Sequence, residues 1–232
     1  MRLFFECFRR YGVARSLGKV AALILWLAVP AQAGQEAAPV TVLALGDSLT
    51  QGYGLPQEDG FVPQLRRWLD AQDIEAEIIN GGVSGDTTAG GAARVGWSLT
   101  AEVDAMIVAL GGNDLLRGID PAVSRANIDT ILREAAARDV EVLLVGMRAP
   151  GNYGAGYKAA FEAIFPDLAE AYGTHLAPDF FAGLGAGDPA ALQQFFQRDG
   201  IHPNAEGVTR IVEALGPHVA ALIASVEPDR HK

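Results

Sequence analysis

Short runs of apolar residues recur along the chain, and polar or amphipathic segments separate them. Four segments of this kind lie at 41–45, 74–79, 104–110 and 140–147, the second with two glutamates among its apolar residues. The first and third run directly into glycine, and continuous apolar runs of this length are typical of parallel strands that are buried on both faces. These runs therefore predict four strands, and a weaker run at 174–177 predicts a fifth.

The segments between the strands have the spacing of helices with one apolar face. Phe61, Leu65 and Leu69 recur at helical spacing, and residues 121–138 repeat the pattern. A glycine-rich loop leading into a helix is expected at 83–96, a helix that Pro166 breaks or kinks at 157–172, and a last helix after Asn204 that Pro217 bends.

Alternating strands and helices predict an α/β layered domain. Five short strands favour a three-layer α/β/α sandwich around a five-stranded, mostly parallel sheet. Right-handed crossovers would bring the carboxyl ends of all strands to one side of that sheet, which is where ligands bind in such folds.

The first 33 residues differ in composition from the rest of the chain. Five basic residues precede or border an apolar run at 20–29, and the small-x-small sequence Ala31-Gln32-Ala33 follows it. This order is typical of a secretory signal peptide. The run is about half of the ~20 residues that a membrane-spanning helix needs, so an uncleaved anchor is the weaker alternative. We expect a signal peptide at 1–33 and a single domain at 34–232.

Charge and cysteine content narrow the class of protein further. Without residues 1–33 the chain has 13 basic and 27 acidic residues, a formal net charge of −14, which disfavours nucleic acid as a partner. The one cysteine, Cys7, lies in the predicted signal peptide, so the mature chain has no disulfide and no cysteine nucleophile. We expect an exported protein, periplasmic or secreted, with no stable membrane span after cleavage.

A serine follows the first strand, in the sequence Gly46-Asp47-Ser48. A serine there commonly forms a turn or caps a helix, but at the carboxyl end of a buried strand it could also be a nucleophile. A serine hydroxyl becomes a good nucleophile when a neutral histidine accepts its proton and a carboxylate orients that histidine.

Among the four histidines, His202 fits this role best. Pro203 favours an extended backbone at His202, and Asp199 precedes it across a turn that contains Gly200, so the carboxylate and the imidazole can meet within one loop. The alternative is a plain loop in which the aspartate binds its own backbone. Two further polar groups follow strand ends: Gly85 could offer a backbone N–H and Asn113 a side-chain amide to an oxyanion, although each could equally serve its own turn.

Four blocks in this order resemble those of the SGNH, or GDSL, hydrolases: GDSLT at 46–50, SGDTT at 84–88, GGND at 111–114 and DGIHPN at 199–204. The likeness covers roughly 40–222, and RAPGNYG at 148–154 is similar to a loop of the bacterial exported esterases, which include acyl-CoA thioesterases, lysophospholipases and arylesterases. The chain has no G-x-S-x-G elbow, which argues against the ordinary α/β-hydrolase fold.

The resemblance implies a flavodoxin-like SGNH hydrolase fold and assigns roles to matching positions. Ser48 would be the nucleophile, His202 the general base and acid, and Asp199 its orienting carboxylate; the backbone N–H groups of Ser48 and Gly85 with the Asn113 side chain would form the oxyanion hole. The reaction would cleave esters and thioesters through an acyl-enzyme, with no metal or organic cofactor. Because His202 must be neutral to act as a base, we expect activity to fall as pH drops through the range in which histidine titrates.

Substrate choice is less evident from the sequence. Tyr53, Leu55, Pro150, Tyr153 and Phe181 are candidates for the wall of an acyl pocket, although the aromatic residues among them could equally be ordinary core. Small acyl esters or thioesters and lysophospholipids are the expected substrates. Two alternatives remain open: a carbohydrate O-acetylesterase, and a noncatalytic acyl-binding protein that keeps only the fold.

Overall fold

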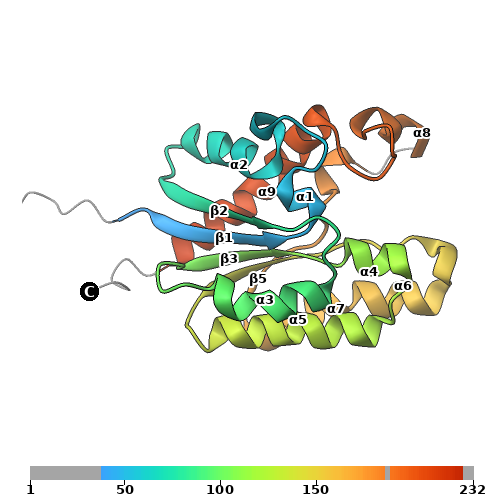
Figure 1. Cartoon of the computed structure of the whole chain (residues 1–232), viewed down its shortest axis with the longest axis horizontal. Coiled ribbons are helices and arrows are strands. Elements are labelled where there is room, and N and C mark those ends of the chain that lie inside the picture. The colour runs from blue at the N-terminus through green and yellow to red at the C-terminus, as the bar shows by residue number, and fades with distance from the viewer. Residues whose placement is uncertain (1–37, 186–188, 227–232) are drawn as a thin grey trace, which may run out of the picture. The chain divides into compact units, whose positions relative to one another are not determined.

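A single parallel sheet organises the part of the chain that the computed structural model describes, residues 38–185 and 189–226 (Figure 1). Its strands are β1 (Val40–Gly46), β2 (Ala76–Gly82), β3 (Ala105–Ala109), β4 (Glu141–Val145) and β5 (His175–Ala177). They pair in parallel in the order β2-β1-β3-β4-β5. The predicted α/β fold with five parallel strands is confirmed.

The register of the central strands brings their carboxyl ends to one edge of the sheet. Gly46, the last residue of β1, pairs with Gly82 of β2 on one side and with Ala109 of β3 on the other. All five residues of β3 are buried, as expected for an apolar strand that is covered on both faces. The loops after β1, β2 and β3 therefore start side by side, and they carry the polar residues considered below.

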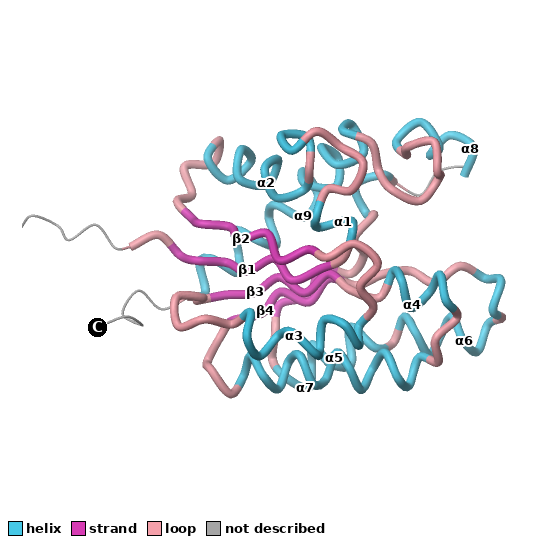
Figure 2. The backbone as a smooth tube through the Cα atoms, in the orientation of Figure 1, coloured by secondary structure: helices cyan, strands magenta, loops and turns pink. Residues whose placement is uncertain are grey.

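Helices cover both faces of the sheet, which gives the three-layer sandwich (Figures 1 and 2). One face carries α2 (Phe61–Asp70) and α9 (Ala205–Ser225), and the other carries α3 (Thr88–Ser98), α5 (Pro121–Ala136) and α7 (Ile164–Tyr172). α2 and α9 approach closely where Gly216 meets the indole of Trp68, since a Cβ at position 216 would lie 2.6 Å from ring atoms. The two helices therefore pack closely against each other on this face of the sheet.

Short helical segments fill the connections. These are α1 (Ser48–Gln51), α4 (Gly112–Arg117), α6 (Ala155–Glu162), α8 (Pro189–Leu192) and the 3₁₀ turns Gln57–Asp59, Gly151–Tyr153, Ala182–Leu184 and Gln193–Phe195. α1 and α4, which were not predicted, begin directly after β1 and β3. Both lie at the edge of the sheet where the strand carboxyl ends meet.

One predicted strand is displaced along the chain, and one predicted helix break is confirmed. β2 covers 76–82 instead of 74–79, because its pairing with β1 continues through Gly81 and Gly82. The expected helix at 157–172 is divided between α6 and α7, and Pro166 lies in the first turn of α7, where no N–H is needed. α9 continues through Pro217 without interruption.

The predicted signal peptide at 1–33 lies outside the described residues. Within them, α9 is long and apolar enough to cross a membrane by length and composition alone, but half of its apolar window is buried inside the protein. Its buried positions include Val208, Ile211, Val219 and Leu222, which belong to the core that packs on the sheet. α9 is thus a core helix.

Candidate active site

The end of β1 holds Ser48 at the first position of α1. Asp47 caps this helix, because its Oδ1 accepts a hydrogen bond of 2.9 Å from the backbone N–H of Leu49. The chain turns tightly here: a Cβ at Gly46 would lie 2.0 Å from Oγ1 of Thr50, so only glycine fits. Ser48 is largely buried, with 9% of its surface exposed, at the edge of the sheet where the strands end.

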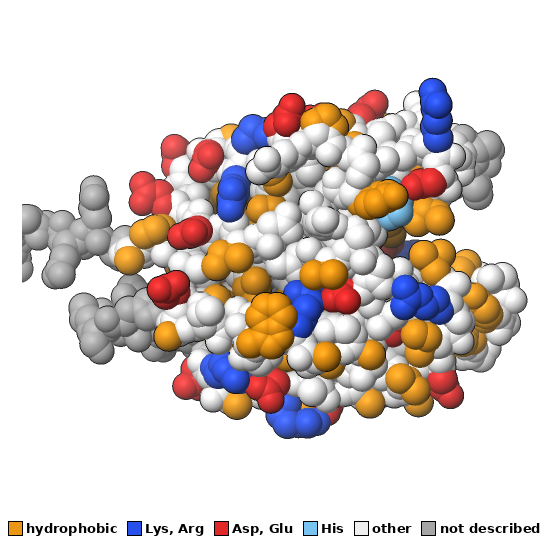
Figure 3. Space-filling model, viewed as in Figure 1, with side chains coloured by type: hydrophobic (Ala, Val, Ile, Leu, Met, Phe, Trp, Pro, Cys, Tyr) orange, Lys and Arg blue, Asp and Glu red, His pale blue; other side chains and the backbone are white. Residues whose placement is uncertain are grey.

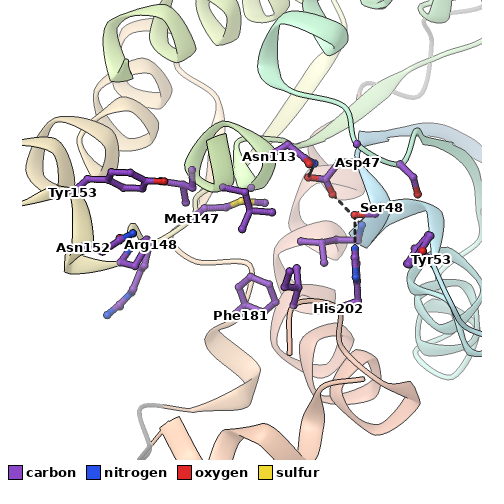
Figure 4. A pocket seen from close by; sticks show the side chains of 18 residues that line it. Asp47, Ser48, Tyr53, Asn113, Met147, Arg148, Asn152, Tyr153, Phe181 and His202 are labelled. Atoms are coloured by element: carbon purple, nitrogen blue, oxygen red, sulfur yellow. Dashed lines mark hydrogen bonds between the residues drawn. The ribbon is translucent and has the colours of Figure 1, made fainter. Parts of the chain in front are cut away.

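The hydroxyl of Ser48 is hydrogen-bonded to His202, whose Nε2 lies 2.9 Å from the serine Oγ (Figure 4). On the other side of the ring, Nδ1 of His202 lies 2.7 Å from Oδ2 of Asp199. A carboxylate only accepts hydrogen bonds, so Nδ1 carries the proton and Nε2 is left to accept the proton of the serine. Residues 154 positions apart in the chain are thus joined in one polar relay.

The loop before α9 fixes the direction of the imidazole. The second oxygen of Asp199, Oδ1, accepts the backbone N–H groups of Ile201 and His202 at 2.9 and 3.0 Å. Gly200 has φ +68°, a left-handed conformation that glycine adopts without strain. The hydrogen bond from His202 and these two N–H groups lower the pKa of Asp199 from 3.8 to about 2, which keeps it ionised. The predicted contact within one loop is present.

Asn113 lies at the start of α4, next to the end of β1. Its amide Nδ2 donates a hydrogen bond of 3.2 Å to Oδ2 of Asp47 (Figure 4). Burial raises the pKa of Asp47 from 3.8 to about 6, although the hydrogen bonds from Leu49 and Asn113 and the charge of His202 act in the opposite direction. A carboxylate with 1% of its surface exposed therefore stands directly beside Ser48 and Asn113.

The loop after β2 carries Gly85, which has φ +83°. Its carbonyl accepts a hydrogen bond of 2.9 Å from Nη2 of Arg117 at the end of α4. Arg94 reaches the same region from α3: Nε binds Asp86 at 2.7 Å and Nη2 donates to the carbonyl of Gly46 at 2.8 Å. The Gly85 loop is thereby tied both to α4 and to the end of β1.

A buried carboxylate, Asp114, fastens α4 to its neighbours. Its two oxygens accept the backbone N–H of Thr88 at 2.8 Å, the hydroxyl of Thr88 at 2.6 Å and the hydroxyl of Ser124 at 2.8 Å. Asp114 follows Asn113 directly, and Thr88 lies three positions after Gly85. The same network therefore fixes both segments that were predicted to supply oxyanion donors.

A cavity of about 510 Å³ opens at this edge of the sheet. Hydrophobic side chains gather on both sides of the hollow (Figure 3). The predicted residues that line it are Ser48, Tyr53, Gly85, Asn113, Pro150, Tyr153, Phe181 and His202. Ser48 and His202 lie at one end, whereas Tyr153 lies at the other end, beyond Met147 (Figure 4). The predicted residues from four distant blocks thus share one cavity.

Two of the predicted site residues lie outside the lining. Asp199 lies behind His202, where its predicted contact with the imidazole places it. Leu55 does not line the cavity: it is half-buried and packs against the core, so its expected place in the pocket wall is wrong. Sequence reasoning missed Asp47, Leu49, Ser84, Gly112, Leu115, Leu116, Met147, Arg148, Asn152 and Ile201. Most of these residues lie within, or next in sequence to, one of the four blocks or the loop at 148–154. Their closeness to those segments could have indicated that they line the cavity.

Ionic groups are sparse in this cavity. Arg148 lies at the end where Tyr153 and Asn152 are found (Figure 4). It forms an ion pair of 3.2 Å with Asp179. Burial raises the pKa of Asp179, and the charge of Arg148 partly offsets this. Within 38–185 and 189–226, no group of three or more histidine, cysteine or acidic side chains is arranged to hold a metal ion.

An α/β/α sandwich with a serine, a histidine and an aspartate hydrogen-bonded in series at the strand ends is the arrangement of a serine hydrolase. Comparison with known proteins narrows this class. The model of the GDSL-like Lipase/Acylhydrolase family matches residues 44–210, and the chain belongs to this family, whose members hydrolyse ester bonds.

Individual relatives agree with this membership. The chain is 37% identical over 190 residues to Esterase TesA of Pseudomonas aeruginosa, which covers 82% of this chain and 92% of the relative. It is 34% identical over 190 residues to Thioesterase 1/protease 1/lysophospholipase L1 of Escherichia coli, with 82% and 88% covered. The crystal structure of AlinE4, an SGNH-hydrolase family esterase, is 42% identical and superposes with a TM-score of 0.65 over 79% of this chain and 96% of that one. The predicted family is confirmed.

Proposed function

We propose that the chain hydrolyses acyl esters and thioesters through an acyl-enzyme on Ser48. His202 acts as general base and then as general acid, and Asp199 orients it. The relay from Ser48 Oγ to His202 Nε2 at 2.9 Å, and from His202 Nδ1 to Asp199 Oδ2 at 2.7 Å, carries this proposal. Both distances are within the range in which a proton can pass directly between the groups.

The reaction has two halves. Ser48 Oγ attacks the carbonyl carbon of the substrate while Nε2 of His202 takes the serine proton, and the alcohol or thiol departs with that proton. Water then attacks the acyl-enzyme: His202 takes a proton from the water, the acid leaves and the proton returns to Ser48. Asp199 stays ionised throughout and stabilises the imidazolium that forms in each half.

Negative charge develops on the carbonyl oxygen in both halves and needs hydrogen-bond donors. We assign these to the backbone N–H groups of Ser48 and Gly85 and to the amide of Asn113. Gly85 and Asn113 line the same cavity as Ser48, and glycine at position 85 leaves no side chain between its backbone and a substrate. One such donor contributes roughly 100-fold or more in rate.

The lining of the cavity favours an apolar acyl group. Leu115, Met147, Pro150, Tyr153 and Phe181 lie along it, and its volume of about 510 Å³ is much larger than an acetyl group needs. An acyl chain that extends from Ser48 towards Tyr153 would bury its methylenes against these side chains. This supports esters and thioesters of medium or long acyl chains, lysophospholipids among them, over acetylated sugars. The related esterase and thioesterase/lysophospholipase support the same choice.

Initial rates on p-nitrophenyl esters from acetate to palmitate, with Ser48→Ala in parallel, test this function. We expect a maximum at medium or long chains and loss of activity in Ser48→Ala, together with loss of labelling by a fluorophosphonate probe. Undiminished activity in Ser48→Ala would refute the mechanism. Activity confined to acetate would refute the acyl-chain assignment and favour a carbohydrate O-acetylesterase, and an unlabelled Ser48 would favour a noncatalytic acyl-binding protein.

Export belongs to the same proposal. The basic and apolar pattern at 1–33 supports a signal peptide cleaved after Ala33, which would release the enzyme to the periplasm or the medium. The mass of the protein recovered from the periplasmic fraction tests this. A mature chain that begins at Gly34 is the expected result, and a full-length chain in the membrane fraction would show an uncleaved anchor.

A further inference from the structure

Asp47 is a buried carboxylate that the proposed reaction does not use. It lies between β1 and Ser48 with 1% of its surface exposed, and it lines the cavity. Its two oxygens have separate tasks, because Oδ1 accepts the N–H of Leu49 at 2.9 Å and Oδ2 accepts the amide of Asn113 at 3.2 Å. Both donors are neutral. The buried carboxylate of Asp47 is therefore negatively charged without a hydrogen bond from a cationic group.

Helix capping does not explain why this side chain is charged. Asparagine and serine cap helix N-termini about as well as aspartate does, and neither leaves a charge to be buried. The bond from Oδ1 to Leu49 could therefore be made without the cost of an ionised group. Asparagine at position 47 could not, however, accept the second hydrogen bond, from Asn113. The second polar atom of its side chain would be an amide nitrogen, which donates.

The orientation of the Asn113 amide decides whether it can serve an oxyanion. The two ends of this amide are almost equal in shape and opposite in hydrogen bonding: Nδ2 has two N–H groups, and Oδ1 only accepts. With Nδ2 turned towards Asp47, one N–H binds the carboxylate and the second remains available on the same nitrogen. If the amide turned over, a carbonyl oxygen would face the carboxylate and the place where negative charge develops, and it would repel both.

We propose that Asp47 is a positioning residue that holds the Asn113 amide in the donor orientation required for the oxyanion hole. This inference rests on the proposed function, since it gives Asn113 its role there. The side-chain hydrogen bonds of Asp47 run to the N–H of Leu49 and to the amide of Asn113, and not to Ser48 or His202. Its contribution to the rate passes through Asn113 alone.

A double-mutant cycle separates this role from a structural one. Asp47→Asn keeps an oxygen for the cap of Leu49 and presents an amide nitrogen to Asn113, which turns the Asn113 amide over. We expect kcat on the preferred p-nitrophenyl ester to fall roughly 100-fold with KM changed less than about threefold, as for Asn113→Ala. In the Asn113→Ala background, Asp47→Asn should cause no further loss.

A buried aspartate far from the site provides the matched control. Asp104 is 5% exposed and accepts the N–H of Thr41 at 2.8 Å at the opposite edge of the sheet. Asp104→Asn should leave kcat unchanged, which shows that loss of a buried carboxylate is not itself the cause. If Asp47→Asn does not fold, Asp47→Ser tests the same point, because serine also caps α1.

Two results would overturn the inference. Wild-type kcat in a folded Asp47→Asn enzyme would show that the charge is not needed for the orientation. The fold-losses in kcat of the two single variants could also multiply in the double variant. That result would show that Asp47 acts on Ser48 or on the fold and not through Asn113. Failure of the proposed function would be distinguishable from both, because Ser48→Ala would then remain active.

Discussion

The ring of Tyr53 packs against the ring of His202, with 4.7 Å between their centroids and 41° between their planes. Gln197 joins the two loops that carry these residues. Its side chain donates to the carbonyl of Tyr53 at 2.8 Å, and its backbone N–H donates to the carbonyl of His202 at 2.7 Å. The imidazole is therefore held by an aspartate on one side and covered by an aromatic ring on another.

Removal of this ring should weaken catalysis without abolishing it. Aromatic pairs contribute about 0.5–1.5 kcal/mol beyond burial of area, so Tyr53→Ala should lower kcat/KM roughly 2- to 10-fold as His202 loses its cover. Tyr53→Phe keeps the ring and should retain nearly full activity. Steady-state kinetics of both variants check this, and an equal loss in Tyr53→Phe would assign the effect to the hydroxyl group.

The orienting carboxylate should be far more important for catalysis than for folding. Asp199→Asn places an amide N–H against Nδ1 of His202, which leaves the proton on Nε2, where it cannot accept from Ser48. We expect kcat to fall by roughly 10⁴-fold, the loss that a wrong histidine tautomer causes in serine hydrolases. Thermal unfolding should show little change, because 38% of the Asp199 side chain is exposed. A loss below about 10-fold would contradict its role.

Asp47 should make the stability of the fold depend on pH. Its pKa is about 6 in the fold and 3.8 in an ordinary environment, so the folded state binds more protons than the unfolded state between these values. The free energy of unfolding should therefore decrease as pH rises from about 4 to 6, by roughly 3 kcal/mol, and should stay lower above that range.

Asp47→Asn removes this titration and gives the test. The variant should unfold at higher urea concentration than wild type at pH 8 and at nearly the same concentration at pH 4. Urea unfolding of both proteins across this range isolates Asp47 from the other carboxyl groups, since those titrate in both. A variant no more stable than wild type at pH 8 would contradict the prediction. If the variant gains stability and loses activity, Asp47 is a site where catalysis is maintained at the expense of folding stability.

Tyr153 should affect long acyl chains more than short ones. It lies at the end of the cavity far from Ser48 (Figure 4), with its ring 4.9 Å from that of Tyr157. Each methylene that a substrate buries contributes about 0.8 kcal/mol, or roughly fourfold in kcat/KM. Tyr153→Ala should therefore lower kcat/KM on long-chain esters roughly 10-fold and leave acetate unchanged.

A large exposed aromatic residue elsewhere provides the comparison for Tyr153. Trp97 on α3 is 74% exposed and does not line the cavity, so Trp97→Ala should not change the profile of activity against chain length. Equal losses on acetate and palmitate in Tyr153→Ala would mean that this ring supports the loop and not the acyl chain.

Much of the fold could be predicted because most strands are short apolar runs, two of which lead directly into glycine. The relay at Ser48 and His202 was predictable for a related reason, since the fold class brings strand ends together and Asp199 lies within reach of the histidine in its own loop. α4 was missed because Gly111-Gly112-Asn113-Asp114 has the composition of a turn. In the fold, Gly111 has φ +122° and the buried Asp114 pairs with Thr88, a residue 26 positions away.

The errors and omissions share a physical cause. Leu55 was expected in the wall of the acyl pocket, but its side chain packs against the core. The bond between Asp47 and Asn113 joins residues 66 positions apart, and no local pattern gives the direction of an amide. Side-chain orientation across elements is set by tertiary contacts, which a single sequence does not contain.

The 154 positions between Ser48 and His202 have a consequence for the life of the chain before it is folded. In the proposed mechanism the nucleophile is synthesised early and its base late, so a growing chain carries the hydroxyl of Ser48 without its proton acceptor. Hydrolysis can begin only when the C-terminal part of the chain has docked on the sheet. In the proposed mechanism, the appearance of esterase activity in time therefore reports the docking of that part of the chain on the sheet.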